Sequence, residues 1–220
     1  VRKLFQTNRS ETIAALMNDS VLVPEGRYDF DWLSLISRSV DLHQGWIAAN
    51  ECRFGSSVGL IPTHDAAVQA TVAELIRLHP KVSAVVDGDA DGQRYADALD
   101  AALEPPAVIV RWPDGWTIEN VVGWILGADQ PSVLAALDVD WGADNLEALV
   151  TMLKSKDRAA NGLKGDYVAY EAIADLIGQL ELCRARARIF LNDLASAVNG
   201  ADVPRFITPR GQPRVRVMLP

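Results

Sequence analysis

Four short apolar runs without polar alternation recur along the first half of the chain. They are "SVLVP" (20–24), "VGLIP" (58–62), "VSAVVD" (82–87) and "PAVIVR" (106–111). Unbroken runs of this kind, rich in Val and Ile, are typical of strands that are covered on both faces. Helical patterns separate the runs, so the alternation predicts an α/β fold with a mostly parallel four-stranded sheet flanked by helices.

From about residue 116 onward the pattern is helical only. Apolar positions at helical spacing run through "IENVVGWIL", "NLEALVTMLKS" and "DYVAYEAIADLIGQLELCRARARIFLNDLASAV". We therefore expect an α/β core with an N-terminal lead-in over 1–127 and a helical subdomain over 128–200. An Arg/Pro-rich C-terminal segment follows over 201–220, with one short β-like run, "VRVML".

Acidic side chains follow two of the four predicted strands. Glu25 and Asp29 come after the first strand, and Asp87, Asp89 and Asp91 follow the third in "VVDGDADG". Function in such sheets gathers at the carboxyl ends of the strands. Because like charges this close repel each other, a cation is expected among them if the first and third strands are near neighbours.

Three kinds of site use such an aspartate cluster. An EF-hand calcium loop starting at Asp87 needs a Glu at its twelfth position, where Ala98 stands, and a helix before it, so it is excluded. A phosphotransferase of the haloacid-dehalogenase kind has its DxD after the first strand, not the third, and stays an alternative. The third is a magnesium site for phosphodiester chemistry.

Two blocks, "VLVPEGRYDFDWL" (21–33) and "VSAVVDGDADGQRYADAL" (82–99), resemble the TOPRIM domain of topoisomerases, bacterial primases, recombination mediators and OLD-family (overcoming lysogenization defect) nucleases. The lead-in "VRKLFQTNRSETIAALMNDSVLVPEG", "WTIENVVGWIL" and "NGLKGDYVAYEAIA" make the chain most similar to the C-terminal nuclease region of an OLD-family protein. One departure is Pro24, where TOPRIM domains usually have an aliphatic residue before the Glu. The resemblance implies a Rossmann-like TOPRIM fold and a metal-dependent DNA endonuclease or nickase.

The resemblance also implies which residues bind metal. Glu25, Asp29, Asp87 and Asp89 carry over as ligands of two Mg²⁺ or Mn²⁺ ions, and Glu25 is also a candidate catalytic residue. Such hard cations take oxygen ligands, and two of them can promote phosphodiester hydrolysis. Glu119, just after the fourth strand, is the further carboxylate; its other interpretation is an ordinary acid in the first turn of a helix.

Lys164 in "NGLKG" is the candidate catalytic lysine, because a loop lysine could reach a scissile phosphate and stabilise the transition state. The alternative is a solvated surface lysine. Lys154 lies at the expected end of a helix and is less attractive.

Two helix caps can be predicted as well. Asp91 could either bind a metal ion through water or cap the helix at "GQRYADAL". The cap is favoured, and direct metal binding by Asp91 is left open. Either Thr63 or Asp65 is expected to cap the helix after the second strand.

Composition narrows the class of protein. The 220 residues carry a net charge of −8, which argues mildly against indiscriminate binding to a polyanion, although arginines gather near the end of the chain. Cys52 and Cys183 are far apart with no CxxC, so neither a disulfide framework nor a zinc site is expected, and a reducing cytoplasm is the default. No apolar stretch approaches the roughly 18 residues of a membrane span, and no basic-then-apolar leader opens the chain.

Partners follow from the resemblance. DNA is the expected substrate, a homodimer is left open, and no membrane is involved. The resemblance to OLD-family proteins implies an ABC-type ATPase domain in the full-length protein. The chain opens "VRKLFQ" without an initiator Met and contains no GxxxxGK[ST] loop, so that domain is expected outside this sequence. The alternative function is a non-cleaving TOPRIM module that binds DNA or protein, as recombination mediators do.

Overall fold

A computed structural model of the chain describes residues 9–43, 53–64, 67–137 and 141–220. The chain divides into two compact units, each described by itself below. Unit 1 comprises Val1–Asp31, Asn50–Thr117 and Leu191–Pro220, and unit 2 comprises Trp32–Ala49 and Ile118–Phe190. The boundaries near 127 and 200 that the sequence suggests stay predictions.

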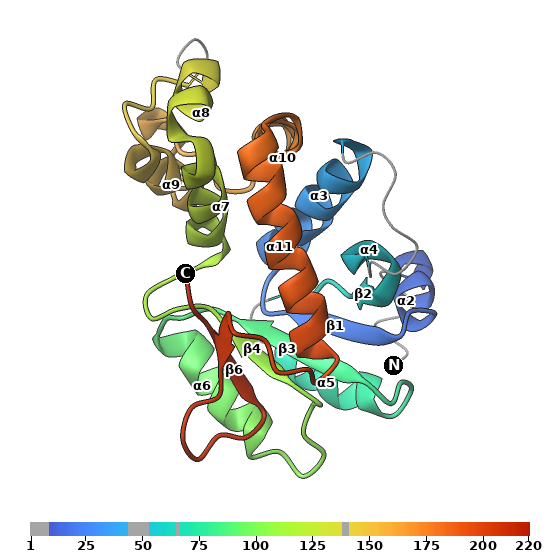
Figure 1. Cartoon of the computed structure of the whole chain (residues 1–220). Helices are drawn as coiled ribbons and strands as arrows, with labels where there is room; N and C mark the ends of the chain where they lie inside the picture. The colour runs from blue at the N-terminus through green and yellow to red at the C-terminus, as the bar shows by residue number, and fades with distance from the viewer. Residues whose placement is uncertain (1–8, 44–52, 65–66, 138–140) are drawn as a thin grey trace. The chain divides into compact units, whose positions relative to one another are not determined.

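Unit 1 is built on a six-stranded sheet with the strand order β2-β1-β3-β4-β6-β5 (Figure 1). All neighbouring strands are parallel except β5 and β6. The predicted α/β class with a mostly parallel, helix-flanked sheet is therefore confirmed. The strands are β1 (Ser20–Pro24), β2 (Val58–Leu60), β3 (Val82–Val86), β4 (Ile109–Arg111), β5 (Phe206–Ile207) and β6 (Val215–Met218).

The sheet has two strands more than the four that the sequence predicted, and both come from the C-terminal segment. β6 pairs parallel with β4, with Val215 opposite Ile109, and β5 pairs antiparallel with β6. β6 falls on the β-like run "VRVML" noted in the sequence, which was not counted as a strand of the sheet because β-propensity depends strongly on packing context. Pairing along β4 is what makes this segment a strand.

Helices cover the sheet. α5 (Val68–Ile76) and α6 (Ala90–Asp100) join one apolar cluster with alternate strand residues such as Val21, Val23 and Ala84. The residue between the inward-facing positions 82 and 84, Ser83, points away and donates its hydroxyl to the Val198 carbonyl at 3.4 Å. The last part of α11 (Glu181–Val198) therefore lies against the opposite face of the sheet. Two further helices of this unit are α2 (Arg9–Leu16) and α4 (Phe54–Ser57).

Unit 2 is helical. The Trp32 ring on α3 (Arg27–His43) stacks on the Tyr170 ring with 4.2 Å between centroids, which fixes α3 against α10 (Tyr167–Gln179). None of the described helices is long and apolar enough to cross a membrane. The remaining helical segments are α7 (Ile118–Leu126), η2 (Gly127–Asp129), α8 (Gln130–Leu137), α9 (Leu146–Lys154) and η3 (Arg158–Ala160).

The long helical pattern over 166–198 is divided in the structure. Leu180 takes an extended backbone between α10 and α11. Arg184 of the next helix donates to the carbonyls of Gly178 and Gln179 at 2.5 and 3.2 Å. Since the last carbonyls of a helix lack internal donors, this arginine satisfies two of them and allows the chain to turn.

Candidate functional site

Glu25 and Asp87 meet at the carboxyl edge of the sheet. β1 pairs with β3 in parallel, with Pro24 opposite Val85, so the residues after both strands emerge side by side. The Asp87 backbone N–H donates to Glu25 Oε2 at 3.0 Å, and one carboxylate oxygen of Asp87 is fully buried. The neighbouring placement of the first and third strands, on which the sequence argument depended, is therefore confirmed.

Thr63 holds the turn that carries Glu25. Its hydroxyl lies 2.6 Å from the Pro24 carbonyl and 2.8 Å from the Glu25 carbonyl, and the residue is buried. The predicted capping role of Thr63 is wrong, because α5 begins only at Val68 after Ala67, which makes no side-chain cap. Asp65, the other predicted cap, lies outside the described residues.

Main-chain bonds clamp the loop between Asp87 and Asp89. Gly88 donates its N–H to the Trp116 carbonyl at 2.7 Å and accepts from the Gly115 N–H at 2.9 Å. Arg111, at the end of β4, lies with Nη2 3.5 Å from the Gly88 carbonyl and also pairs with Asp114. Gly88 is therefore held both by Arg111 at the end of β4 and by the turn that follows β4.

Asp89 caps α6. Its carboxylate accepts from the Gly92 N–H at 2.8 Å, and the helix begins at Ala90. The predicted cap, Asp91, lies in the first turn and pairs with Arg94 at 3.0 Å. The prediction that Asp91 caps this helix is wrong, because the helix starts two residues earlier than its apolar pattern indicates.

Asp29 lies in the first turn of α3 and is buried, with 6% of its surface exposed. The Trp112 indole N–H points to Asp29 Oδ1 at 3.4 Å. A carboxylate this buried needs polar partners or a cation, since burial without them is costly. The pattern of apolar residues along α3 did not predict that Asp29 would be buried.

The donors at this edge are carboxylates, which suit Mg²⁺ or Mn²⁺. Their grouping is incomplete, however. Among the described residues, no three His, Cys, Asp or Glu side chains lie close enough together to hold a metal ion as they stand. Glu25, Asp29, Asp87 and Asp89 thus fit such an ion in their chemistry, and a described hydrogen bond joins only Glu25 and Asp87 among them.

Glu119 and Lys164, which lie far apart in the sequence, come together in unit 2. Lys164 Nζ is 3.6 Å from Glu119 Oε1, and Glu119 is 1% exposed in the first turn of α7. The Lys164 side chain keeps 25% of its surface exposed. Lys164 is therefore no freely solvated lysine, and Glu119 is no ordinary surface acid; whether they bind metal and phosphate stays a prediction.

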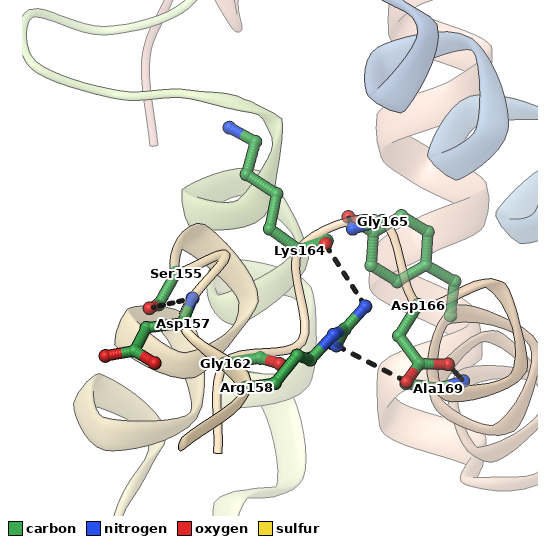
Figure 2. A network of polar contacts seen from close by, with 9 residues as sticks. Ser155, Asp157, Arg158, Gly162, Lys164, Gly165, Asp166 and Ala169 are labelled. Carbon is green, nitrogen blue, oxygen red and sulfur yellow. Dashed lines mark hydrogen bonds and ion pairs between the residues drawn. The ribbon is translucent and has the colours of Figure 1, made fainter. Parts of the chain in front are cut away.

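The loop between α9 and α10 that carries Lys164 is densely hydrogen-bonded (Figure 2). Arg158 donates to the Gly162 carbonyl at 2.5 Å and lies 3.4 Å from an Asp166 carboxylate oxygen. In Figure 2 the Lys164 side chain extends away from Arg158. The loop backbone is thus tied together on one side while the ammonium group points to the other.

No protein-family model, curated protein or solved structure matches this chain. The TOPRIM and OLD-family interpretation therefore rests on the sequence motifs themselves.

Three residues that hold candidate residues in place, two in unit 1 and one in unit 2, were not predicted for that role. Thr63 and Arg111 each follow or end a parallel strand, and position at the carboxyl edge of the sheet could have singled them out. Tyr170, whose hydroxyl accepts from the Gly165 N–H at 2.9 Å, gives no such sign. In the sequence it is one more large residue on an amphipathic helix.

Proposed function

We propose that this chain is a metal-dependent DNA endonuclease or nickase. The observation that carries the proposal is the meeting of Glu25 and Asp87 at the ends of two neighbouring parallel strands. The Asp87 backbone N–H donates to the Glu25 carboxylate, which places two acidic residues at one edge of the sheet. A divalent cation bound there would offset the repulsion between their charges. The absence of His and Cys from the set favours Mg²⁺ or Mn²⁺.

Glu25 and Asp87 would hold the first ion, and Asp89 and Asp29 would supply further carboxylate oxygens from the turns next to them. When bound, a pair of such ions supplies an activated water and neutralises charge on the phosphate. Glu25 would also have a structural role, because its carboxylate accepts a hydrogen bond from the Asp87 N–H and so links the ends of the two strands. Glu119 is the proposed ligand of the second ion.

Lys164 is proposed to stabilise the negative charge that develops on the scissile phosphate. A fixed positive group is worth more than a mobile one, since it needs no reorganisation during the reaction. The contact of Lys164 with buried Glu119 and the bonded loop backbone support this role. A lysine free in solvent would have neither.

The wider assignment is part of the same proposal. The chain would be a TOPRIM domain and the C-terminal nuclease region of an OLD-family protein that works in the cytoplasm on DNA, together with an ABC-type ATPase domain. A haloacid-dehalogenase-like phosphotransferase is disfavoured, because β3, not β1, precedes the DxD.

The test is cleavage of supercoiled plasmid with Mg²⁺, with Mn²⁺ and with chelator. Glu25→Gln keeps an oxygen that can accept the Asp87 N–H, so it removes the charge while keeping the strand ends together. Glu25→Gln and Asp87→Asn should abolish metal-dependent nicking. Asp91→Asn is the matched control, because this acid is exposed and pairs only with Arg94 among the contacts described. Near-normal cutting by either of the first two variants would refute the metal assignment.

A second candidate is a TOPRIM module that binds DNA or protein without cutting. One observation favours it: the acids have structural partners, namely the Asp87 N–H for Glu25, the Gly92 N–H for Asp89 and Trp112 for Asp29. In that case the wild type would bind DNA in a gel-shift assay but leave the plasmid supercoiled with every metal. The same preparation therefore separates the two functions.

A further inference from the structure

Three contacts fix the main chain around Lys164. The Lys164 N–H donates to the Ser155 carbonyl at 2.9 Å, and the next N–H, that of Gly165, donates to the Tyr170 hydroxyl at 2.9 Å. On the carbonyl side, Arg158 Nη2 lies 3.5 Å from the Lys164 oxygen. A solvated surface loop rarely has every backbone group near one residue engaged in this way.

Tyr170 is a rigid anchor. It is 1% exposed, and its ring stacks on Trp32 at 4.2 Å with 28° between the planes. Its helix is capped by Asp166, which accepts from the Ala169 N–H at 3.2 Å. The phenol oxygen is therefore held by packing on the helix and gives the Gly165 N–H a fixed acceptor.

Arg158 closes the loop from the other end. Its guanidinium reaches the Gly162 carbonyl, the Asp166 carboxylate and the Lys164 carbonyl (Figure 2). A planar fork with five donors can satisfy several acceptors at once, whereas an ammonium group cannot match that geometry. The arginine thus links the turn before Lys164 to the cap of α10 after it.

We propose that Tyr170 and Arg158 are positioning residues, whose contacts with the loop backbone hold the Lys164 ammonium group toward Glu119 in the geometry that phosphate hydrolysis requires. This inference rests on the proposed function of Lys164. Misplacement of a catalytic group by about 1 Å can lower a rate by about 10²-fold. Tyr170→Phe removes one oxygen and leaves the stacked ring, so it is the sharpest single change.

The experiment compares Tyr170→Phe with Tyr167→Phe, a matched control on the same helix at a residue that is 49% exposed. Tyr170→Phe should lower kcat for plasmid nicking by about 10- to 100-fold and leave DNA affinity unchanged, because the ammonium group is displaced without being lost. Arg158→Lys should behave similarly, since it keeps the charge but loses the fork. Tyr167→Phe should match the wild type.

Two further measurements separate positioning from general loosening. In the Lys164→Ala background, Tyr170→Phe should cause no additional loss of kcat, because residues that act as one unit are not additive. Acylation of Lys164 by an amine-reactive ester, followed by mass spectrometry against exposed Lys81 as internal reference, should be faster in Tyr170→Phe than in the wild type.

The outcomes decide as follows. Wild-type kcat together with wild-type Lys164 labelling in Tyr170→Phe would overturn the inference, as would a further loss of kcat in the Lys164→Ala background. If the wild type itself cuts no DNA, the nuclease proposal fails separately. The labelling then decides alone: faster acylation of Lys164 supports positioning by Tyr170, and unchanged acylation overturns it.

Discussion

Gly88 is a position where one added methyl group should disturb the candidate metal centre. A Cβ at this residue would overlap the Pro113 carbonyl oxygen, well inside the 3.0 Å that real Cβ contacts respect. The obstacle is backbone, which cannot rotate aside as a side chain can. Gly88→Ala must therefore push the loop that contains Asp87 and Asp89 away from the turn at 113–116.

The cost follows from the contacts at stake. Displacement weakens the bonds from Gly88 N–H to the Trp116 carbonyl (2.7 Å) and from Gly115 N–H to the Gly88 carbonyl (2.9 Å). Each is worth about 0.5–1.5 kcal/mol net, and forcing an extra methyl into a packed place costs about 1–3 kcal/mol. We expect a loss of about 3 kcal/mol in the free energy of unfolding, which corresponds to a fall in Tm of about 6–12 °C for a chain of this size.

Urea unfolding followed by circular dichroism measures this loss, and two other glycines serve as controls. Gly127→Ala should be neutral or slightly stabilising, because the nearest atoms to its Cβ lie at an ordinary 3.7 Å. Gly115→Ala meets no atom within 4 Å but has φ +75°, so it isolates backbone strain, of about 1 kcal/mol. A Gly88→Ala protein as stable as Gly127→Ala would refute the described packing of this loop.

Further predictions concern the lysine, the buried thiol and the metal. Lys164→Ala should lower cleavage by about 10²–10³-fold with little loss of DNA affinity, Lys164→Arg should rescue poorly, and Lys154→Ala should match the wild type; equal loss of binding and cleavage would make Lys164 a simple DNA contact. Lys164→Met should lower the free energy of unfolding, measured in urea, by about 1–3 kcal/mol, because the Glu119 carboxylate stays buried without the lysine's charge. The double variant with Glu119→Gln should regain most of that free energy. Additive losses in the double variant would contradict the ion pair. Burial raises the pKa of the Cys183 thiol, so in a Cys52→Ser background iodoacetamide should alkylate it slowly at pH 8 and quickly in urea; fast alkylation without urea would contradict its burial. Finally, Mg²⁺ or Mn²⁺ should raise the Tm by binding the folded state, and a Tm indifferent to both would count against an organised site.

The sequence by itself determined the class of fold and the positions of most elements. Short runs rich in Val and Ile at 20–24 and 82–87 favour buried strands over helices, and β1 and β3 occur there. The period of "IENVVGWIL" likewise matches α7 over Ile118–Leu126. These signals are local, because the spacing of apolar residues within one strand or helix reflects which of its faces are buried. The same local patterns predicted where each strand ends, and so they placed the acidic residues that follow β1 and β3 at the carboxyl edge of the sheet.

Tertiary structure alone decided what each of these residues touches. The β-like run "VRVML" became β6 because β4 offers an edge to pair with, and the run alone could not show which strand it would join. The cap of α6 fell to Asp89 because the chain turns one residue after Gly88, which the turn at 113–116 holds in place. Glu119 and Lys164 are 45 positions apart in sequence (164 − 119), so only the packing of unit 2 could bring their charges to 3.6 Å. Contacts between distant residues depend on the path of the whole chain, and that path is decided by packing energies that no short stretch of sequence contains.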